Sequence, residues 1–264
     1  QARPTILGVQ EAENRRVLWY LTQSLRRNHS QQYREYAIEG RDHYTEQDVG
    51  ILLRPPAELT ALTQHAYPRR LRSSNRYYDV SKHVMAEIEF QHGGKLYPLT
   101  VLNIHLRARP EGEPFRIRQA RLIHRWMANA IEEGKDVIVL GDFNTEERGD
   151  ELRRDSDVGI LAGLETETTD DDLVDLSLRL PAGKRGTHLL PGRQYDRILC
   201  SRSLVEDDPD QPDLVFSKIE VLAGLNVKGE LDEQQAHWEG YWDIPAAERD
   251  LSDHLPVMAT FEVR

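Results

Sequence analysis

Four short polar segments follow apolar runs in the sequence, at the points where those runs end. They are Gln10-Glu11, Asn103-Ile104-His105, Gly141-Asp142-Phe143-Asn144 and Ser252-Asp253-His254. Catalytic and binding residues concentrate in loops that a rigid scaffold positions, so each segment is a candidate part of a reactive site. Each one alone also fits an ordinary turn or a surface loop, but the four together favour a common chemical function.

The residue types in these segments fit the hydrolysis of a phosphate ester. This reaction needs a cation that neutralises the phosphoryl oxygens, a base that activates water and neutral donors that hold the phosphate in line. Glu11 and Asp253 offer the hard oxygen ligands that suit Mg²⁺, and Mn²⁺ accepts the same kind of ligand. Because Mg²⁺ keeps several of its waters, one or two carboxylates from the protein are enough.

Asp142 and Asn144 are spaced so that they can act on the same phosphate. In an extended segment, residues two apart point to the same side, while Phe143 between them points back into the core. The carboxylate can then take a proton from water while the amide holds the phosphate. We therefore predict catalytic roles for both residues.

Two histidines and a third carboxylate extend this set. His105 and His254 can donate to a phosphoryl oxygen. Asp196, in the run Tyr195-Asp196-Arg197-Ile198, is suited to orient one of these imidazoles. The predicted catalytic residues are His105, Asp142, Asn144, Asp196 and His254.

The elements that must position these residues follow from the hydropathy pattern. Helical spacing is found over 17–25 and over 117–131, and a short helix is predicted at 173–180. Gly93-Gly94 favours a hairpin between two of the strands. Because strands outnumber helices and alternate with them, we expect sheets packed face to face with helices outside. Strands are predicted at 5–10, 49–53, 84–90, 99–106, 137–140, 195–200, 214–222 and 255–263.

Length and charge limit the classes of protein that fit. The 264 residues contain no repeat and no low-complexity linker, which favours one domain spanning residues 1–264. The net charge of −11 argues against a protein that holds nucleic acid by bulk positive charge, so a polyanionic substrate would need a local basic patch and a bound cation. The acidic stretches 165–175 and 205–213 are predicted to be solvated loops.

The single cysteine and the absence of long apolar runs add little about location. Cys200 lies in an apolar run and is predicted to be buried, and a lone cysteine permits no intramolecular disulfide. No apolar stretch approaches the roughly 18 residues that a membrane span needs. We expect a soluble monomer, and both a cytoplasmic and a secreted location stay open.

The motifs, in their order along the chain, resemble the endonuclease/exonuclease/phosphatase superfamily, which is deoxyribonuclease I-like. The order is Gln-Glu, Asn-x-His-Leu, Gly-Asp-Phe-Asn, Tyr-Asp-x-Ile-Leu and Ser-Asp-His-x-Pro-Val, between Leu7 and Phe261. The resemblance implies a four-layer α/β sandwich, in which two mostly antiparallel β-sheets pack face to face with helices outside. The superfamily includes nucleases, sphingomyelinases, inositol-phosphate phosphatases and deadenylases, so it implies the reaction better than the substrate.

The resemblance also implies a role for each motif residue. Glu11 would be the main Mg²⁺ ligand, and Asp253 would complete the metal shell. Asp142 would act on the attacking water, and Asp196 would orient His254. Residues implied on the phosphate are His105, Asn144 and His254, and Asn103 and Arg107 are assigned to substrate binding.

An arginine-rich segment resembles that of bacterial members, which carry Asn-x-His-Leu-Lys-Ser before an Arg-rich helix. Arg107 stands at the position of that Lys. Since a guanidinium suits bidentate contact with phosphate, these arginines predict a phosphate-binding patch at the mouth of the site, and a solvated helix face with ordinary ion pairs is the alternative. The four arginines concerned are Arg107, Arg109, Arg116 and Arg118.

Two features depart from the superfamily pattern. Its members begin with a strand ending in an Asn that supports the metal site, and no such strand precedes Glu11. An Arg followed by an acid is replaced by Lys82-His83, which leaves Asp79 as a stand-in partner for His105.

Several residues outside the motifs have simpler interpretations. The other histidines considered, His43, His65, His188 and His237, lack ligand spacing and are predicted to be surface or structural residues. The aromatic residues Trp238, Tyr241 and Trp242 fit either base stacking or a small satellite core. Thr187 lies in a loop that many relatives place beside the substrate, and it receives no role.

We therefore expect a Mg²⁺-dependent phosphodiesterase that uses direct attack by water, with DNA as the first choice of substrate and both endonuclease and exonuclease action open. The alternative is a phosphatase or phosphodiesterase acting on a lipid, inositol or nucleotide phosphate, which the acidic charge favours. A weaker alternative is an inactive binding module. The catalytic carboxylates and histidines argue against it.

Overall fold

A six-stranded mixed sheet forms the centre of the computed structural model, which describes residues 2–40, 45, 47–65, 76–190, 192–210, 213–228 and 234–264. Neighbouring strands run antiparallel, except that β6 and β7 are parallel. The parallel pair is connected through helix α3 (Glu113–Glu132). In spatial order the strands are β4 (Ala57–Thr63), β5 (His83–His92), β6 (Lys95–His105), β7 (Asp136–Asp142), β9 (Asp196–Ser201) and β8 (Leu173–Asp175).

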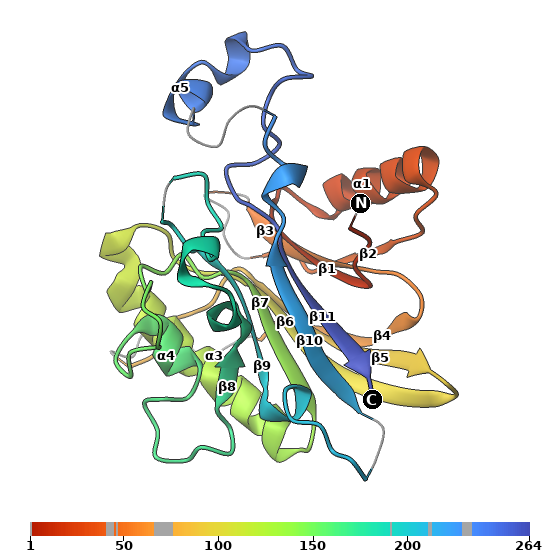
Figure 1. Cartoon of the computed structure of the whole chain (residues 1–264), viewed down its shortest axis with the longest axis vertical. Coiled ribbons are helices and arrows are strands. Elements are labelled where there is room, and N and C mark those ends of the chain that lie inside the picture. Colours follow the sequence, from red (N-terminus) through yellow and green to blue (C-terminus); the bar gives the residue numbers. More distant parts are fainter. Residues whose placement is uncertain are drawn as a thin grey trace.

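Two smaller antiparallel sheets cover one face of this central sheet (Figure 1). One has the order β1 (Ile6–Ala12), β3 (Asp48–Leu53) and β2 (Arg34–Ala37), and the other pairs β10 (Leu214–Val221) with β11 (Val257–Val263). The core between the layers is apolar, and it includes buried Cys200, whose thiol pKa burial raises to about 12. Its other members include Ile51, Val101, Ile138, Leu214 and Ile219.

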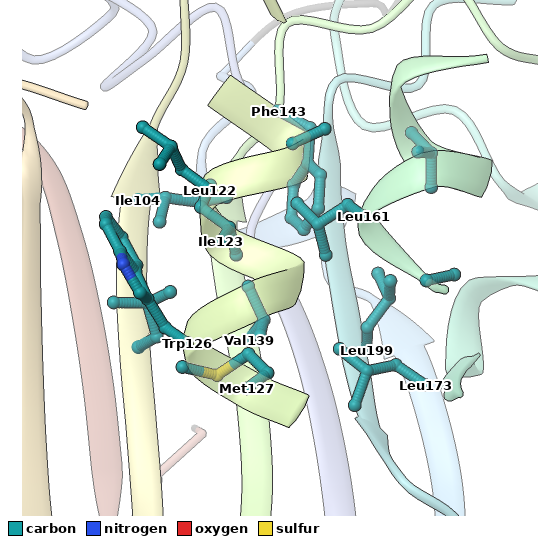
Figure 2. Packing of buried hydrophobic residues seen from close by; sticks show 14 of the residues in the cluster. Ile104, Leu122, Ile123, Trp126, Met127, Val139, Phe143, Leu161, Leu173 and Leu199 are labelled. Carbon is teal, nitrogen blue, oxygen red and sulfur yellow. The ribbon is translucent and has the colours of Figure 1, made fainter. Parts of the chain in front are cut away.

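Helices form the two outer layers. Helix α1 (Arg15–His29) lies over β1, β3 and β2, and Leu18 packs there against Leu52. Helix α3 and helix α4 (Asp157–Leu161) cover the opposite face of the central sheet. Figure 2 shows Leu122, Ile123, Trp126 and Met127 of α3 against Ile104, Val139 and Leu199 of the sheet. The predicted four-layer sandwich is therefore confirmed.

Short elements complete the chain. The 3₁₀ helices are η1 (Pro110–Gly112), η2 (Leu176–Arg179), η3 (Ala182–Lys184), η4 (Arg202–Leu204), η5 (Ala223–Leu225) and η6 (Tyr241–Asp243), and the last α-helix is α5 (Gln234–Glu239). The segment with α5 and η6 projects beyond the sandwich in Figure 1. No helix in the described part of the chain is long and apolar enough to cross a bilayer.

The helix predicted at 173–180 is wrong in its first half. Leu173–Asp175 forms the edge strand β8, which pairs with β9, and only the following turn is helical. The prediction that 165–175 is a solvated loop is also wrong at its end. Asp172 and Asp175 are buried, and they form ion pairs with Arg202 and Arg197. Strand pairing and buried charge partners outweigh the local pattern here, because a buried carboxylate needs a partner.

Candidate active site

Strand register brings three of the predicted residues into one row. His105 is the last residue of β6 and lies opposite Asp142, the last residue of β7. Asp142 lies in turn opposite Asp196, the first residue of β9. Because β6 and β7 are parallel, their carboxyl ends meet at the same edge of the sheet, and antiparallel β9 begins at that edge. The imidazole and the two carboxylates therefore share one end of the sandwich.

Asn144 holds the carboxylate of Asp142 at both oxygens. Its backbone N–H donates to Oδ1 at 2.8 Å, and its side-chain Nδ2 donates to Oδ2 at 2.8 Å. Asn144 adopts the left-handed region with φ 49°, which asparagine tolerates better than most residues. Phe143 between them is fully buried, as predicted. The turn after β7 thus presents both polar side chains on the same side.

His105 and Glu11 lie beside Asp142. The Nε2 atom of His105 is 3.5 Å from Oδ2 of Asp142 and 3.9 Å from Oε1 of Glu11. Glu11 has φ 56° and stands where the register between β1 and β3 shifts. A bulge of this kind redirects a side chain, and here Glu11 stays half exposed beside the buried histidine.

Gln47, which no sequence pattern singled out, connects Glu11 to the ammonium group of Lys82. Its Nε2 donates to Oε1 of Glu11 at 2.9 Å, and its Oε1 accepts from Nζ of Lys82 at 3.0 Å. The only signal in the sequence is a polar residue directly before strand β3. Asp79, the predicted stand-in partner of His105, has its backbone carbonyl bonded to Gln119.

His254 is paired with Asp196, as the sequence predicted. Its Nδ1 lies 2.8 Å from Oδ2 of Asp196. Burial, the largest single influence, lowers the pKa of His254, but the hydrogen bond to Asp196 and the charges of Asp196, Asp142 and Asp253 together raise that pKa to about 9. The imidazole is therefore protonated at neutral pH and can donate to an anion.

Asp142 is a carboxylate that resists ionisation. Burial raises its pKa to about 7, and the negative charges of Asp196 and Glu11 act in the same direction. The charge of His254 and the hydrogen bond from the backbone N–H of Asn144 lower this pKa, but by less. Several carboxylates thus face one another around a buried position. A bound cation would relieve this repulsion, since it favours the ionised forms.

His188 was interpreted as a surface or structural histidine, but it lies in the site. Its ring stands edge-on to His254 at 5.1 Å, and its Nε2 is 3.5 Å from Oδ2 of Asp253. The N–H of Leu190 donates to Nδ1 of His188, so Nε2 carries the proton and faces the carboxylate. As a donor, His188 lowers the pKa of Asp253 against the effect of burial.

Thr187 next to it also has a defined place. Its Oγ1 accepts from the backbone N–H groups of Tyr195 at 2.9 Å and of Asp196 at 3.0 Å. The loop thereby fixes the start of β9. Two signals in the sequence point to His188. It follows Gly186 and Thr187, and this loop lies beside the substrate in many relatives.

The donor atoms fit a divalent cation. Among the described residues, two groups have ligand atoms within 4.8 Å of one another. One is His188, Asp253 and His254, and the other is Asp142, Asp196 and His254. The oxygen atoms in these groups all belong to carboxylates, which are ligands of Mg²⁺ and Mn²⁺, and the nitrogen atoms come from His188 and His254. Glu11 stands on the His105 side of Asp142, whereas Asp253 stands on the His254 side.

Asn103 lies beneath the site and is fully buried. Its Nδ2 donates to the carbonyls of Val9 and Gly50, and its Oδ1 accepts from Gln10. The side chain therefore joins β6 to β1 and β3, and it holds the segment that carries Glu11. Its polar atoms do not reach the surface.

The predicted arginine patch is divided. Arg116 is fully buried, paired with Asp157 and bonded to the carbonyls of Arg107 and Arg109, so its assignment to the patch is wrong. Position 116 continues the apolar stripe of α3 through Ala120 and Ile123, which explains the burial. Arg107 and Arg109 are exposed, and Arg118 is half-buried.

The remaining residues singled out in the sequence lie apart from this row. His65 stacks on Trp126 at 4.4 Å, and His237 lies beside Asp250. Trp238 stacks on Tyr241 at 4.8 Å in the projecting segment, which fits the satellite core. Trp242 is 80% exposed there. His43 lies outside the described residues.

A family model described as Endonuclease/Exonuclease/phosphatase family matches residues 1–254. The chain belongs to this family. It is therefore a hydrolase of phosphate esters that depends on a divalent metal. A comparison with curated protein sequences found no match.

Solved structures share the fold of this family member at low sequence identity. An endonuclease/exonuclease/phosphatase from Bacteroides vulgatus is 17% identical, with TM-score 0.60 over 98% of this chain and 85% of that one. TDP2 of D. rerio, complexed with a single strand DNA product, is 14% identical, with TM-score 0.54 over 98% and 86%. The mannosyl-6-phosphatase Bt3783 of Bacteroides thetaiotaomicron is 16% identical, with TM-score 0.56 over 98% and 85%.

Proposed function

We propose that this protein is a Mg²⁺-dependent phosphodiesterase that cleaves DNA by direct attack of water on the scissile phosphate. The observation that carries the proposal is the row of His105, Asp142 and Asp196 at one end of the central sheet, with His254 bonded to Asp196. A base, a cationic donor and acidic metal ligands are thereby adjacent. These are the groups that phosphoryl transfer to water requires.

Asp142 is the base in this mechanism. Burial raises the pKa of this carboxylate, to about 7 in the absence of a cation, and a carboxylate with a raised pKa accepts a proton from water more readily than an ordinary one. Asn144 keeps this carboxylate in place through two hydrogen bonds. The side-chain N–H groups of Asn144 are both donated within the protein, to Asp142 and to the carbonyl of Leu106, so Asn144 positions the base and the imidazole of His105 holds the phosphate beside the water.

His254 stabilises the charge that develops on the phosphoryl oxygens. The protonated ring donates through Nε2, because its Nδ1 is engaged by Asp196. Glu11 and Asp253 would hold the metal, which would supply positive charge for the phosphoryl oxygens. His188 orients the carboxylate of Asp253 through its protonated Nε2.

Of the two residues assigned to substrate binding, Asn103 acts through the segment that it holds. The buried amide fixes the backbone of β1, from which Glu11 projects. Arg107 is exposed two residues beyond His105, and its guanidinium binds substrate phosphate directly.

DNA is the first choice of substrate because an exposed arginine group stands at the edge of the site, and because a relative of the same fold is complexed with a single strand DNA product. A small phosphate ester is the second candidate, favoured by the net charge of −11 and by the mannosyl-6-phosphatase of the same fold.

An assay in Mg²⁺ or Mn²⁺ against supercoiled plasmid, linear DNA, single strands, RNA, sphingomyelin, and inositol and sugar phosphates separates the two. Nicking of plasmid indicates an endonuclease, and release of nucleotides from linear DNA alone indicates an exonuclease. Turnover of small esters without cleavage of DNA would contradict the proposal.

Replacing His254 by Ala should lower kcat by about 10² to 10³, because the variant loses a cationic donor to the developing charge. Asp196→Asn should lower kcat by less, and it should lower the pKa of the His254 ring. The change weakens the hydrogen bond and removes one negative charge, while the burial of the ring remains. Steady-state kinetics measure the first effect, and an NMR titration of the ring nitrogens in metal-free protein measures the second. A His254 pKa that stays near 9 in Asp196→Asn would contradict the assigned pairing.

A further inference from the structure

Four side chains form a compact cluster at the first turns of helix α3, beside the end of β6. The guanidinium carbon of Arg118 lies 4.9 Å from the ring centroid of Tyr78 and 4.9 Å from that of Phe115. Arg107 lies over the Phe115 ring at 5.9 Å, and the two rings meet edge to face at 5.0 Å. We call Tyr78, Arg107, Phe115 and Arg118 the arginine–aromatic cluster.

The arginines of this cluster have no carboxylate partner among the described residues. Other described arginines, Arg26 among them, also lack an ion pair, but these two lie side by side against the same aromatic ring. Within the described part of the chain, ion pairs engage Arg15, Arg116, Arg121, Arg148, Arg153, Arg185, Arg193, Arg197, Arg202 and Arg264. The cluster is therefore a local positive region on a protein whose net charge is −11.

The aromatic rings hold the guanidinium groups without using their donors. Only Nε of Arg118 donates to a described residue, the carbonyl of Pro114 at 3.2 Å, and the guanidinium of Arg107 donates to none of the described residues. Cation–π contact restricts the side chains and leaves most N–H groups available to an anion. An exposed arginine that is already ordered loses less entropy when it binds phosphate.

The cluster begins at the edge of the catalytic row. Arg107 follows Leu106, whose N–H donates to the carbonyl of Asp142 and whose carbonyl accepts from Nδ2 of Asn144. The backbone between the base and the cluster is therefore fixed by hydrogen bonds. A ligand that places one phosphate on the row and extends along this side meets the cluster next.

We propose that the arginine–aromatic cluster binds a backbone phosphate of a DNA strand next to the scissile phosphate. This inference rests on the proposed function, and it deepens it, because an ester with one phosphate cannot occupy both positions. The cluster would then favour a polynucleotide over a small ester. The alternative is a structural role, in which these contacts only hold the segment around Tyr78 against α3.

The test compares Arg118→Gln and Arg118→Lys with Arg26→Gln. Arg26 is an exposed arginine on α1, in the opposite outer layer, so its replacement removes the same charge elsewhere. For each protein, kcat/KM is measured with a fluorescein-labelled oligonucleotide and with bis(p-nitrophenyl) phosphate. In Arg118→Gln, kcat/KM for the oligonucleotide divided by kcat/KM for bis(p-nitrophenyl) phosphate should fall about 10-fold. The slope of log affinity for DNA against log salt should flatten by about one unit. Arg118→Lys should keep the slope and lose part of the affinity, and Arg26→Gln should change neither.

An unchanged ratio in Arg118→Gln would overturn the inference. An equal loss with both substrates, accompanied by a lower Tm, would also overturn it and would indicate the fastening role. If the wild-type protein hydrolyses no phosphodiester, the proposed function fails, and binding of the labelled oligonucleotide still tests the cluster by fluorescence anisotropy. Weaker binding by Arg118→Gln than by Arg26→Gln would then support the cluster on its own.

Discussion

Asp142→Asn is expected to lower kcat by roughly 10² to 10⁴, with little change in KM. The amide has the shape of the carboxylate, but it keeps only one of the two acceptor oxygens that Asn144 uses, and it cannot accept a proton from water. The variant loses one hydrogen bond from Asn144, and it also loses a buried negative charge that Asp196 and Glu11 repel, so the two effects on stability oppose each other. Steady-state kinetics with DNA in Mg²⁺ measure both constants.

Stability provides the control for this variant. The folded-state pKa of Asp142 is about 7, above the ordinary 3.8, so ionisation of this group opposes folding. Its contribution to stability is present at low pH and is lost as pH rises from about 4 to above 7. The Tm of metal-free Asp142→Asn at pH 8 should therefore be no lower than that of the wild-type protein. Asp170→Asn, which makes the same change at an exposed position, should alter neither kcat nor Tm. Near-normal turnover in Asp142→Asn would remove Asp142 from the role of base.

The position of the site could be predicted because strand ends can be recognised in the sequence. The residues of Gly141-Asp142-Phe143-Asn144 follow a short apolar run, and the alternation placed Phe143 inside, where the structure has it. Register could not be predicted in the same way. That Asp142 faces both His105 and Asp196 depends on which strands are neighbours, and no local pattern determines this.

The residues that sequence reasoning misassigned owe their place to contacts that are distant along the chain. His188 enters the site through a bridge to His254 and a contact with Asp253, both more than 60 residues away. Asp175 is buried because Arg197 on the neighbouring strand neutralises it. Arg116 is the exception, since its helical spacing with Ala120 already predicts a buried position.

Chelation should abolish hydrolysis, and added Mg²⁺ or Mn²⁺ should restore it. The physical reason is the crowding of carboxylates around Asp142, which a cation neutralises, and the same cation balances the charge of the phosphate. The measurement is the initial rate of DNA cleavage after dialysis against EDTA, followed by a titration with each metal. Undiminished turnover in excess chelator would contradict a metal-dependent mechanism.

The same titration tests which residue holds the metal. Glu11→Gln should raise the Mg²⁺ concentration that gives half-maximal activity by roughly 10-fold or more, because changes at residues that only support metal ligands already cost 10- to 100-fold in affinity. Glu13→Gln is the matched control, since it makes the same change at an exposed position two residues along the chain. Mn²⁺ binding to each variant, followed by electron paramagnetic resonance, gives a readout that does not depend on activity. If Glu11→Gln binds Mn²⁺ as tightly as Glu13→Gln, the metal is held from the other side of Asp142, by Asp253 with His188 and His254 around it.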